Sequence, residues 1–583
     1  MAIENLITDH LDLWTAAVCP KSSAGRGSNS KLELIGIKKL RELILELAVR
    51  GKLVPQDPSD EPASVLLERI AAEKARLVKE KKIKKSKALP EISEEEKPFE
   101  LPEGWIWARL NDLGDWGAGA TPTRSNSDFY GGNIPWFKSG ELTSDYIFKS
   151  EESVTELALS KSSLRYNDVG DVLVAMYGAT IGKTAILGVK ATTNQAVCAC
   201  TPFDGFSNLY LLQLLKAYRP RLIGMGAGGA QPNISKDKII ATIVALPPFN
   251  EQKRIVSKID DLMTLCDQLE QRSESQLVAH QTLVETLLTT LTDSADSDEL
   301  AQNWARLSTH FDTLFTTEAS IDALKQTILQ LAVMGKLVPQ DPSDEPASAL
   351  LERIAAEKAQ LVKEKKIKKE KPLPAISEDE KPFELPQGWA WARGEDIADF
   401  VDPQPSHRTP PEVEDGVPYI GYTDIDHERG INFDNARKVS EVILQEHKER
   451  YQIKDGDFVF GKIGTLGKPF FLQAPFNYCL SANLILIQPR IGCTHPVYLA
   501  TYLNSPTLYQ TLDTQKTNST HAVFGIKKAR LLVVPFPPIS EQHRIVTKVD
   551  ELMTLCDQLK SRLQTSQQTQ LALAESLVEG ALA

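Results

Sequence analysis

Gly51-Lys-Leu-Val-Pro-Gln-Asp-Pro-Ser-Asp-Glu-Pro-Ala-Ser64 occurs twice in the chain, and the second copy occupies Gly335–Ser348. Extended to Lys87 and Lys371, the two copies agree at 34 of 37 positions. A second block, residues 251–269, returns at residues 541–559 with 15 of 19 identities. Similarity of a chain to itself at a long period indicates an internal repeat. The sequence therefore predicts two copies of one architecture.

Between these blocks the two halves differ almost completely. A few short motifs match at corresponding positions of the two halves, such as Gly170-Asp-Val172 and Gly456-Asp-Phe458. Nearly identical frames indicate one contact that is made twice, and divergent interiors indicate two different targets. The alternative is a recent duplication with unequal drift in exposed loops. It fits less well because the interiors have the composition of packed domains rather than of loops.

The framing blocks predict helices. Leu32–Val49 and Ile321–Val333 are apolar at helical spacing. The blocks that begin at Glu251 and Glu541 each follow a Pro-Pro pair and carry apolar residues at 4-3-4-3 spacing, which is a heptad seam. The seam positions are Ile255, Ile259, Leu262, Cys266 and Leu269 in the first copy and Ile545, Val549, Leu552, Cys556, Leu559 and Leu563 in the second. We expect the two helices to pair as an antiparallel coiled coil that acts as a spacer.

Each interior has the signals of a mixed domain, with apolar runs that predict strands and Gly- and Asn-rich turns between them. The predicted strands are 172–177, 196–200, 458–460 and 484–487, and shorter helices are predicted near 209–218 and 497–503. The predicted fold class is α+β: two globular domains with β-sheets, separated by long antiparallel coiled-coil helices, in a pseudo-twofold internal repeat. The expected boundaries are 1–100 for an N-terminal helical region, 101–250 for the first domain, 251–383 for a central long helix plus the repeated helical region, 384–540 for the second domain and 541–583 for a C-terminal long helix.

Composition excludes several classes of protein. The 583 residues are too many for one hydrophobic core, and no apolar run approaches the ~20 residues that cross a bilayer. The seven cysteines include no CxxC pair, so we expect a cytoplasmic protein without disulfides or structural zinc. The net charge of −12 argues against a polyanion partner. However, residues 172–250 carry a net charge of +5 and residues 458–540 carry a net charge of +6.

The motifs that would support catalysis are incomplete. Gly178-Ala-Thr-Ile-Gly-Lys-Thr184 has three residues between its glycines, where a phosphate-binding loop needs four. Its counterpart at 464–468 lacks the hydroxyl residue that would hold magnesium, so a turn permitted by glycine is the better interpretation. Leu246-Pro-Pro-Phe249 lacks the polar first residue of the amino-methyltransferase motif. Since no His, Cys or carboxylate spacing predicts a metal site either, we expect no catalytic residue and no metal in this chain.

Several longer motifs occur in the same order in both halves. The first half contains Phe99-Glu-Leu-Pro-Glu-Gly-Trp-Ile-Trp107, Gly117-Ala-Gly-Ala-Thr-Pro-Thr-Arg124, Gly132-Asn-Ile-Pro-Trp-Phe-Lys-Ser-Gly-Glu141, Gly170-Asp-Val-Leu-Val-Ala-Met-Tyr-Gly178, Gln231-Pro-Asn-Ile-Ser235 and Leu246-Pro-Pro-Phe-Asn-Glu-Gln-Lys-Arg-Ile255. The second half contains Pro382-Phe-Glu-Leu-Pro-Gln-Gly-Trp389, Gly456-Asp-Phe-Val-Phe-Gly461 and Pro537-Pro-Ile-Ser-Glu-Gln-His-Arg-Ile545. By the order and duplication of these motifs, residues 32–583 resemble the specificity subunit of type I restriction-modification enzymes. The second domain departs most, because residues 402–408 and 515–521 replace two loops of the first.

The resemblance implies a DNA-recognition subunit that is not itself an enzyme. Two target-recognition domains would read the halves of a bipartite, asymmetric site in double-stranded DNA, and the helices would set the spacer and dock two modification subunits. Restriction subunits would join the same complex. The resemblance places S-adenosylmethionine, ATP and Mg in these partners, with no cofactor in this chain and no membrane contact. The competing hypotheses are a coiled-coil scaffold with two ligand-binding domains that do not bind DNA, and an ATPase built on residues 178–184.

Specific reading of base edges needs donors and acceptors, which Arg, Lys, Asn and Gln supply. We expect DNA contacts from polar residues in Gly-flanked or strand-end settings; for each position the alternative is a structural turn or a solvated loop. In the first domain the candidates are Thr121, Arg124, Lys138, Tyr177, Lys183, Asn194, Gln195, Gln231, Asn233 and Lys236. In the second domain they are His407, Arg408, Lys462, Lys468, Asn483, Lys516, Asn518 and His521.

Overall fold

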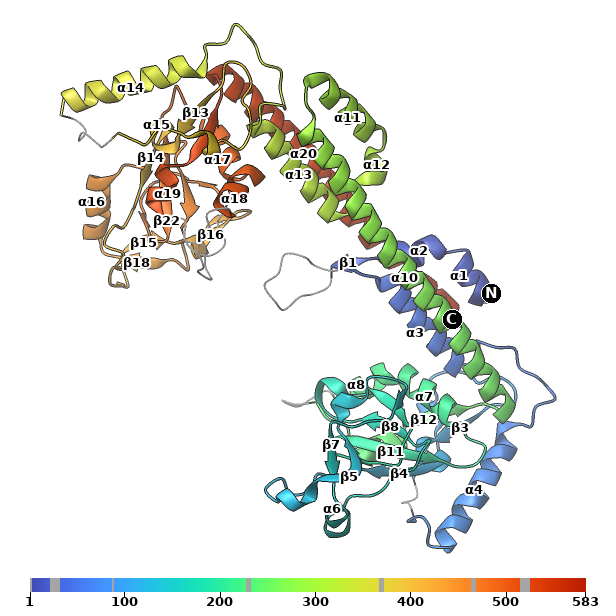
Figure 1. Cartoon of the computed structure of the whole chain (residues 1–583). Coiled ribbons are helices and arrows are strands. Elements are labelled where there is room, and N and C mark those ends of the chain that lie inside the picture. Colours follow the sequence, from blue (N-terminus) through green and yellow to red (C-terminus); the bar gives the residue numbers. More distant parts are fainter. Residues whose placement is uncertain are drawn as a thin grey trace. The chain divides into compact units, whose positions relative to one another are not determined.

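The computed structural model describes residues 3–20, 32–85, 89–226, 232–365, 372–462, 468–513 and 525–582. The chain forms two compact units: Met1–Gln276 with Ser566–Ala583, and Leu277–Thr565. Two long helices, α10 (Phe249–Asp293) and α20 (Ile539–Leu582), each contribute one part to each unit (Figure 1). None of the helices in these ranges is both long enough and apolar enough to span a membrane.

The first domain is built on a five-stranded sheet of order β4-β11-β8-β9-β6. Its central strands are apolar and buried because α7 (Asn208–Ala217) packs on the sheet. The strands of this sheet are β4 (Gly114–Ala118), β6 (Tyr146–Ile147), β8 (Val172–Ala175), β9 (Thr184–Leu187) and β11 (Val197–Pro202). A second sheet of order β10-β5-β7 and the pair β3–β12 complete the domain. Their strands are β3 (Ile106–Arg109), β5 (Tyr130–Phe137), β7 (Glu152–Val154), β10 (Thr192–Thr193) and β12 (Ile243–Leu246).

The second domain repeats this topology with different side chains, except that its main sheet has four strands where the first has five. Its main sheet has the order β14-β22-β19-β20, its second sheet β18-β15-β21, and β13 pairs with β23 as β3 pairs with β12. The strands are β13 (Ala390–Arg393), β14 (Ala398–Val401), β15 (Val417–Ile420), β18 (Arg437–Val439), β19 (Phe458–Gly461), β20 (Phe470–Phe471), β21 (Cys479–Leu480), β22 (Leu484–Pro489) and β23 (Val533–Phe536). The predicted α+β class and internal repeat are confirmed, as are the predicted strands and short helices, the latter as α7 and α17 (Pro496–Leu503).

The repeated blocks of sequence contact each other inside each unit. At the start of α10 the buried carboxylate of Glu251 accepts hydrogen bonds from Trp105 Nε1 (3.0 Å) and Gln56 Nε2 (3.2 Å), although burial raises its pKa. One turn later Arg254 pairs with Asp60 at 2.6 Å. The second unit makes the same contacts with Glu541, Trp389, Gln340, Arg544 and Asp344. The frames are therefore alike in part because one intramolecular contact is made twice.

A buried glutamine completes this junction in both units. The side-chain oxygen of Gln252 accepts a hydrogen bond from Ser207 N (2.9 Å), and its nitrogen donates to the carbonyl oxygens of Pro247 and Gly205. Gln542 does the same with His495 N (2.7 Å), Pro537 O and Cys493 O. Because a buried amide needs all its partners, these bonds fix the first turn of each long helix to its own domain.

A repeated lysine bonds the far end of each long helix. In the second unit Lys336 Nζ donates to Thr292 O (2.7 Å) and Ser294 O (2.9 Å), at the end of α10. In the first unit its counterpart Lys52 donates to Leu582 O (2.9 Å), at the end of α20. A cation is favourable there because the last carbonyls of a helix lack intrahelical donors. Each long helix thus starts on the domain of its own repeat and ends on the repeated block of the other.

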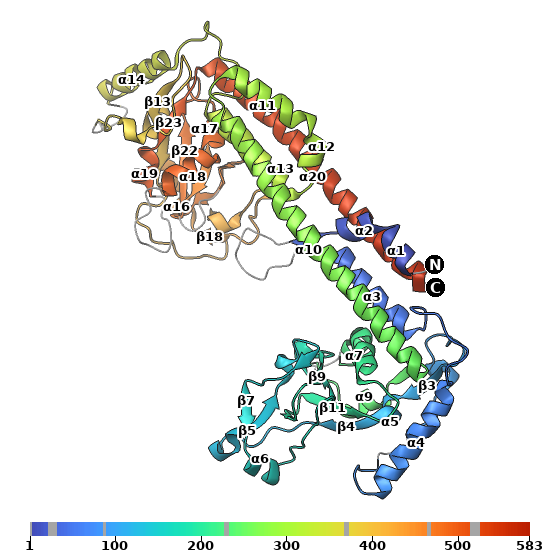
Figure 2. The ribbon, with the colours of Figure 1, turned by 45° about the vertical axis from the view of Figure 1, so that its right-hand side comes forward.

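Each long helix packs against a helix of the N-terminal part of its unit. In the second unit the α20 seam shares one hydrophobic cluster with α13 (Glu318–Val333) and with Val284, Leu288 and Leu291 of α10. There α20 and the last part of α10 run in opposite directions (Figures 1 and 2). In the first unit α3 (Ile35–Val49) lies along the α10 block, and Arg41 pairs at 2.6 Å with both Asp267 and Glu270. The predicted antiparallel pairing is confirmed for α20 and the last part of α10, where the α20 seam packs on α13 and on α10 residues that follow the α10 seam in the sequence.

Candidate nucleic-acid interface

Four loops of the first domain meet at one end of its main sheet. Backbone hydrogen bonds join them in sequence: Gly119 N to Val197 O (2.9 Å), Met176 N to Ala196 O (2.8 Å) and Ile234 N to Met176 O (2.8 Å). This ladder brings together candidates that lie more than a hundred residues apart in the sequence. They are Thr121, Tyr177, Asn194, Gln195 and Asn233, of which all but Asn194 are exposed.

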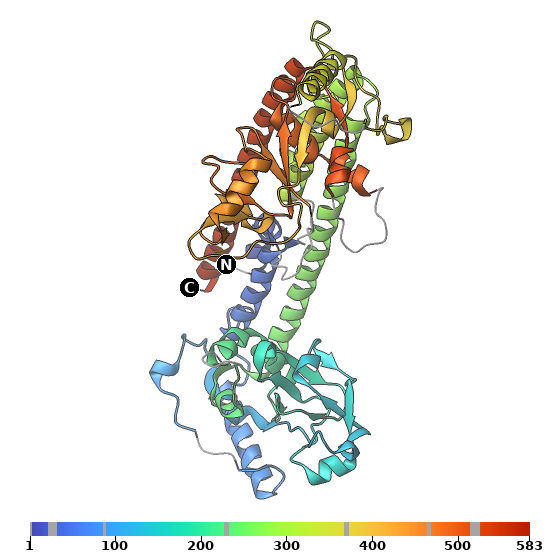
Figure 3. The same cartoon turned by 90° about the vertical axis from the view of Figure 1, so that its left-hand side faces the viewer.

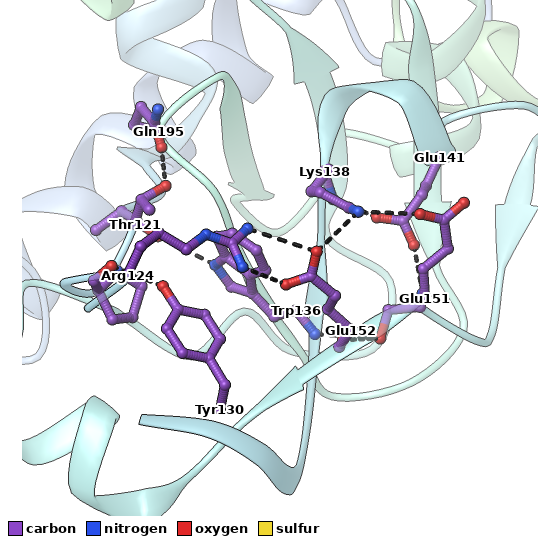
Figure 4. Close-up of polar contacts among 12 residues, drawn as sticks. Thr121, Arg124, Tyr130, Trp136, Lys138, Glu141, Glu151, Glu152 and Gln195 are labelled. Carbon is purple, nitrogen blue, oxygen red and sulfur yellow. Dashed lines mark hydrogen bonds and ion pairs between the residues drawn. The ribbon is translucent and has the colours of Figure 1, made fainter. Parts of the chain in front are cut away.

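Gly119 lets two of these loops approach closely. Ala120 N donates to Thr193 O at 3.0 Å, and a Cβ at Gly119 would lie 2.3 Å from the carbonyl oxygens of both Thr193 and Asn194. Only glycine avoids that clash. The close approach brings the hydroxyl of Thr121 to donate to the side-chain oxygen of Gln195 (Figure 4). Both polar side chains face solvent at this end of the sheet.

Arg124 is held in place by an acidic and two aromatic side chains. Its guanidinium donates to Glu152 at 2.6 Å and lies over the rings of Tyr130 (4.7 Å to the centroid) and Trp136 (4.9 Å) (Figure 4). The hydrogen bond to Glu152 raises the pKa of Arg124, and its two cationic partners, Arg124 and Lys138, lower the pKa of Glu152. The guanidinium is therefore charged and pre-oriented, with 53% of the side chain exposed.

Lys138 extends the same cluster. Its Nζ lies 2.9 Å from Glu151 and 3.1 Å from Glu152, which raises its pKa. Glu141 fixes this corner by accepting bonds from the backbone N of Lys138 and of Glu151, both at 2.6 Å. The predicted Arg124 and Lys138 thus belong to one network. Sequence reasoning missed Tyr130, Trp136 and Glu152; the aromatic pair six residues apart was the available signal.

Two other candidates of the first domain are not part of this hydrogen-bonded ladder. Lys183 follows the short turn Gly178–Thr180 between β8 and β9, so the turn predicted there is confirmed. Lys183 lines a cleft of about 1280 Å³ whose other wall includes Glu42 of α3 and Glu575 of α20. Lys236 is the first residue of α9 (Lys236–Ala241), behind the capping hydroxyl of Ser235. Gln231 lies outside the described residues.

In the second domain one predicted contact residue is buried. Lys462 is 5% exposed, and its Nζ lies 2.8 Å from Asp402 Oδ2. Asn483 is also engaged, since its side-chain oxygen accepts bonds from Tyr422 N (3.3 Å) and from the Ser481 hydroxyl. These two side chains shape the loops of the second domain rather than face solvent. Lys468 is exposed and lines a polar pocket of about 650 Å³ beside α13 and α20. Lys516, Asn518 and His521 lie outside the described residues.

The loop 402–408 presents His407 and Arg408, and a buried histidine supports it. His407 has φ = 51° and, like Arg408, is exposed. Gln404 donates to Ser406 Oγ (3.0 Å) and to Arg408 O (3.2 Å) and accepts a bond from His447 Nε2 (2.8 Å). The other ring nitrogen of His447, in α16 (Glu441–Arg450), bonds the hydroxyl of Tyr451. Burial lowers the pKa of His447 to about 4, so the ring is neutral at physiological pH.

The site has the chemistry of recognition. Thr121, Gln195 and Arg124 in the first domain and Arg408 in the second offer hydroxyl, amide and guanidinium groups, which can bond base edges or phosphates. Within the described ranges, no group of three or more His, Cys, Asp or Glu side chains is placed to hold a metal ion.

Comparison with known proteins identifies the family that this chain matches. The family model "Type I restriction modification DNA specificity domain" matches residues 102–279 and 387–566. The EcoAI and EcoEI specificity subunits of Escherichia coli type I restriction enzymes are 43% and 42% identical, each over 100% of both chains. The crystal structure of an HsdS subunit from Thermoanaerobacter tengcongensis covers 83% of this chain and 98% of that chain, at 18% identity and a TM-score of 0.40.

The family match and the full-length relatives show that this chain belongs to the DNA-specificity subunits of type I restriction-modification systems. The family expected from the sequence motifs is thereby confirmed. The two globular domains are its target-recognition domains, and each lies within one of the two matched segments.

Proposed function

We propose that each target-recognition domain reads one half of a bipartite, asymmetric site in double-stranded DNA. The observation that carries this proposal is one topology presenting different side chains at corresponding places. Four strands of the main sheets have the same order, yet the loop after β4 offers Thr121 and Arg124 where the loop after β14 offers His407 and Arg408. One scaffold with two sets of donors suits two different half-sites.

The Arg124 cluster suits a reader of DNA. The aromatic rings hold the guanidinium in one orientation, so less conformational entropy is lost when it bonds a base or a phosphate. Glu152 satisfies the charge in the free protein and competes with DNA for it. A correct site must therefore replace the carboxylate with an equally good acceptor. This competition favours discrimination over affinity, because incorrect contacts leave Arg124 with Glu152.

We further propose that α10 and α20 set the distance between the half-sites. Both ends of each helix are fixed by buried or charge-assisted bonds, through Gln252 and Lys336 for α10 and through Gln542 and Lys52 for α20. A helix held at both ends keeps its length, at about 1.5 Å per residue.

The remaining chemistry belongs to partners in this proposal. Two modification subunits would supply S-adenosylmethionine-dependent methylation, and restriction subunits would supply ATP- and Mg-dependent cleavage, in the cytoplasm. Partner subunits that share the phosphate contacts would also reconcile a chain of net charge −12 with DNA binding. Purified alone, this chain should neither methylate DNA nor hydrolyse ATP. An ATPase activity that disappears in a Lys183→Ala protein would contradict this assignment.

A domain exchange tests the division of labour. Residues 105–246 would be replaced by the corresponding segment of a related subunit, and methylated sites would be mapped by sequencing after assembly with the partners. We expect one half-site to change and the other to stay. The matched control exchanges residues 389–536 and should change the opposite half-site. A change in both half-sites from either exchange would show that the domains do not read separately.

A further inference from the structure

The first unit carries a helix that projects along the side of its domain. This arm helix is α4 (Ala63–Lys79), in which only Ala63, Leu66 and Ile70 are buried. Figures 1 and 3 show α4 extending along the side of the first domain, with its last turn at the edge of the unit. At about 1.5 Å per residue, its 17 residues carry the far end ~25 Å from the point where the helix begins.

Two hydrogen bonds fix the arm helix to the first domain. Lys74 Nζ donates to Asn111 O at 2.6 Å, and the carboxylate of Glu73 accepts from Asp204 N at 2.9 Å. Both bonds come from the second half of the helix. The far end of the arm therefore keeps a defined position relative to the first domain and its loops.

The far end of the arm is a cluster of lysines. We call Lys79, Lys81, Lys82, Lys84 and Lys85 the arm tip; all five are exposed. Glu80 is the one acidic residue in residues 79–85, and it pairs with Lys82 at 2.8 Å. Among the residues that the structure describes, the other four lysines have no ion-pair partner. Like charges this close repel each other, and apart from Glu80 no described carboxylate offsets that repulsion.

The end of the helix explains only part of this charge. Cations in the last turn interact favourably with the free carbonyls at a helix C-terminus, which accounts for Arg76 and Lys79. The effect falls off within the last turn. Lys84 and Lys85 follow the helix by more than one turn's length of chain, so the helix does not account for them.

The residue that ends the helix is also a lysine where glycine is usual. Lys81 has φ = 58°, and the bonds from Lys81 N to Val78 O (3.1 Å) and from Lys82 N to Leu77 O (3.0 Å) form the Schellman arrangement that ends many helices. Glycine is usual at this left-handed position because a Cβ is unfavourable there. A lysine in its place indicates a use for the charge that the fold itself does not explain.

The second copy of the arm ends in the same way. After α14 (Ala347–Lys363), Lys365 has φ = 57° and its N bonds Val362 O at 3.0 Å. The sequence repeats every lysine of the arm tip, at positions 363, 365, 366, 368 and 369, of which 363 and 365 lie within the described residues and are exposed. The buried central strands of the two domains differ, with Val-Leu-Val-Ala at 172–175 and Phe-Val-Phe-Gly at 458–461. The lysines were kept although the domains beside them changed.

The chemistry of the arm tip favours an extended polyanion. Its ammonium groups stand on flexible stems and bind phosphates as point charges. Arg, Asn and Gln, which are suited to reading base edges, are absent from residues 79–85. Duplex DNA carries one phosphate charge per ~1.7 Å of its axis, so several lysines can bind at once without regard to sequence. Such a contact adds affinity but carries no sequence information.

We infer that the arm tip of α4 binds the phosphate backbone of duplex DNA outside the half-site that the first domain reads. This inference rests on the proposed function, because it adds a contact that ignores sequence to the domain that reads it. Since the arm is fixed to the domain, the contact falls at a defined distance from the half-site. Residues 63–85 carry a net charge of +5, which gives a chain of net charge −12 a local attraction for DNA.

Replacing four lysines of the arm tip tests the inference. The variant with Lys81→Gln, Lys82→Gln, Lys84→Gln and Lys85→Gln would be assembled with modification subunits. Its affinity would be measured on two duplexes that carry the recognised site: one extends about 20 base pairs beyond the first half-site, and the other ends there. We expect at least tenfold weaker binding to the long duplex and unchanged binding to the short one. The slope of log K against log salt on the long duplex should fall by about 0.9 per lost phosphate contact.

Two matched variants separate charge from structure. Arginine at the same four positions keeps every charge and should bind the long duplex as the unchanged chain does. Lys81→Gly removes one charge but relieves the positive φ. It should therefore raise the unfolding temperature or leave it unchanged while binding the long duplex more weakly. A purely structural role for Lys81 would not weaken DNA binding in a protein that is at least as stable.

Three results would overturn the inference. The glutamine variant could bind the long duplex with unchanged affinity and salt slope while still preferring the recognised site; the arm tip would then not touch DNA, and the proposed function would stand. It could bind both duplexes equally weakly, which would place the contact inside the half-site. It could lose the modification subunits in native mass spectrometry, which would assign the arm tip to a protein partner. An unchanged enzyme without preference for a bipartite site would instead refute the proposed function.

Discussion

Insertions into the long helices should test whether they measure DNA. Four residues would be inserted after Gln271 in α10, in the equivalent place after Ser561 in α20, or in both. Four residues lengthen a helix by about 6 Å and turn its continuation only ~40° beyond a full turn. B-DNA rises about 3.4 Å per base pair. The doubly inserted protein should therefore recognise its half-sites with two extra base pairs between them.

The single insertions should behave differently, because α10 and α20 both belong to both units. Lengthening α10 alone leaves α20 about 6 Å too short to keep its own end contacts. The protein can accommodate this difference in length only by breaking the hydrogen bonds at one helix end, such as those from Lys336 to Thr292 O and Ser294 O. Two charge-assisted hydrogen bonds correspond to roughly 3–6 kcal/mol. We expect each protein with a single insertion to be destabilised by about this amount. We also expect it to bind weakly to DNA at every spacing between the two half-sites.

Methylated sites would be mapped by sequencing for each protein assembled with its partners, and stability would be measured by guanidinium unfolding. Paired two-residue insertions are the control: they turn each helix by ~200° and should abolish joint recognition of the half-sites. An unchanged gap in the four-residue double insertion would refute the reasoning. So would full activity in the two-residue protein.

Three further predictions follow from single side chains. Gln252→Ala removes the partner of the part-buried donor Ser207 N and of two acceptors, the part-buried Gly205 O and the buried Pro247 O, so guanidinium unfolding should show a loss of about 2 kcal/mol; a loss below 1 kcal/mol would contradict the anchoring role. The pKa of His447 in the folded protein is about 4, below its ordinary value of 6.5. Its contribution to the free energy of unfolding is therefore complete above pH 6.5 and falls by on the order of 3 kcal/mol as the pH drops toward 4. The stability curve of His447→Asn should lack that decline, and an identical curve would exclude this residue as its source. Gly119→Ala places a Cβ against Thr193 O and Asn194 O and should weaken binding of the first half-site alone, as measured with DNA altered in either half; equal weakening of both would point to general misfolding.

Much of this fold was predictable because its signals are periodic. The duplicated blocks and the heptad seams repeat a pattern, and the short apolar runs predicted as strands at 172–177 and 484–487 stand between turn residues and form β8 and β22. A heptad seam gives the face of a helix that packs but not its partner. The α20 seam therefore identified a buried face correctly, while its contacts with α13 and with the last turns of α10 depended on the tertiary fold.

The site was less predictable because its pairings are distant in the sequence. Glu152 lies 28 residues from Arg124, and nothing in the local sequence indicates that they bond. Lys462 lies in a basic segment and was expected to contact DNA, but it is buried against Asp402, 60 residues earlier. Residue type predicted which groups could bond DNA, whereas exposure was decided by the packing of the domains.

The first unit consists of two segments that are far apart in the sequence, and this affects the order in which the two units are completed during translation. Its last segment, Ser566–Ala583, is synthesised only after the whole of Leu277–Thr565. At about 5–20 residues per second, the intervening segment takes roughly 15–60 s to translate. During that interval Lys52 and Arg50 lack the carbonyl of Leu582 that they later bond. The half that leaves the ribosome first is therefore completed last, and a ribosome that stops before Ser566 would release a second unit with all its residues and a first unit missing a helix segment.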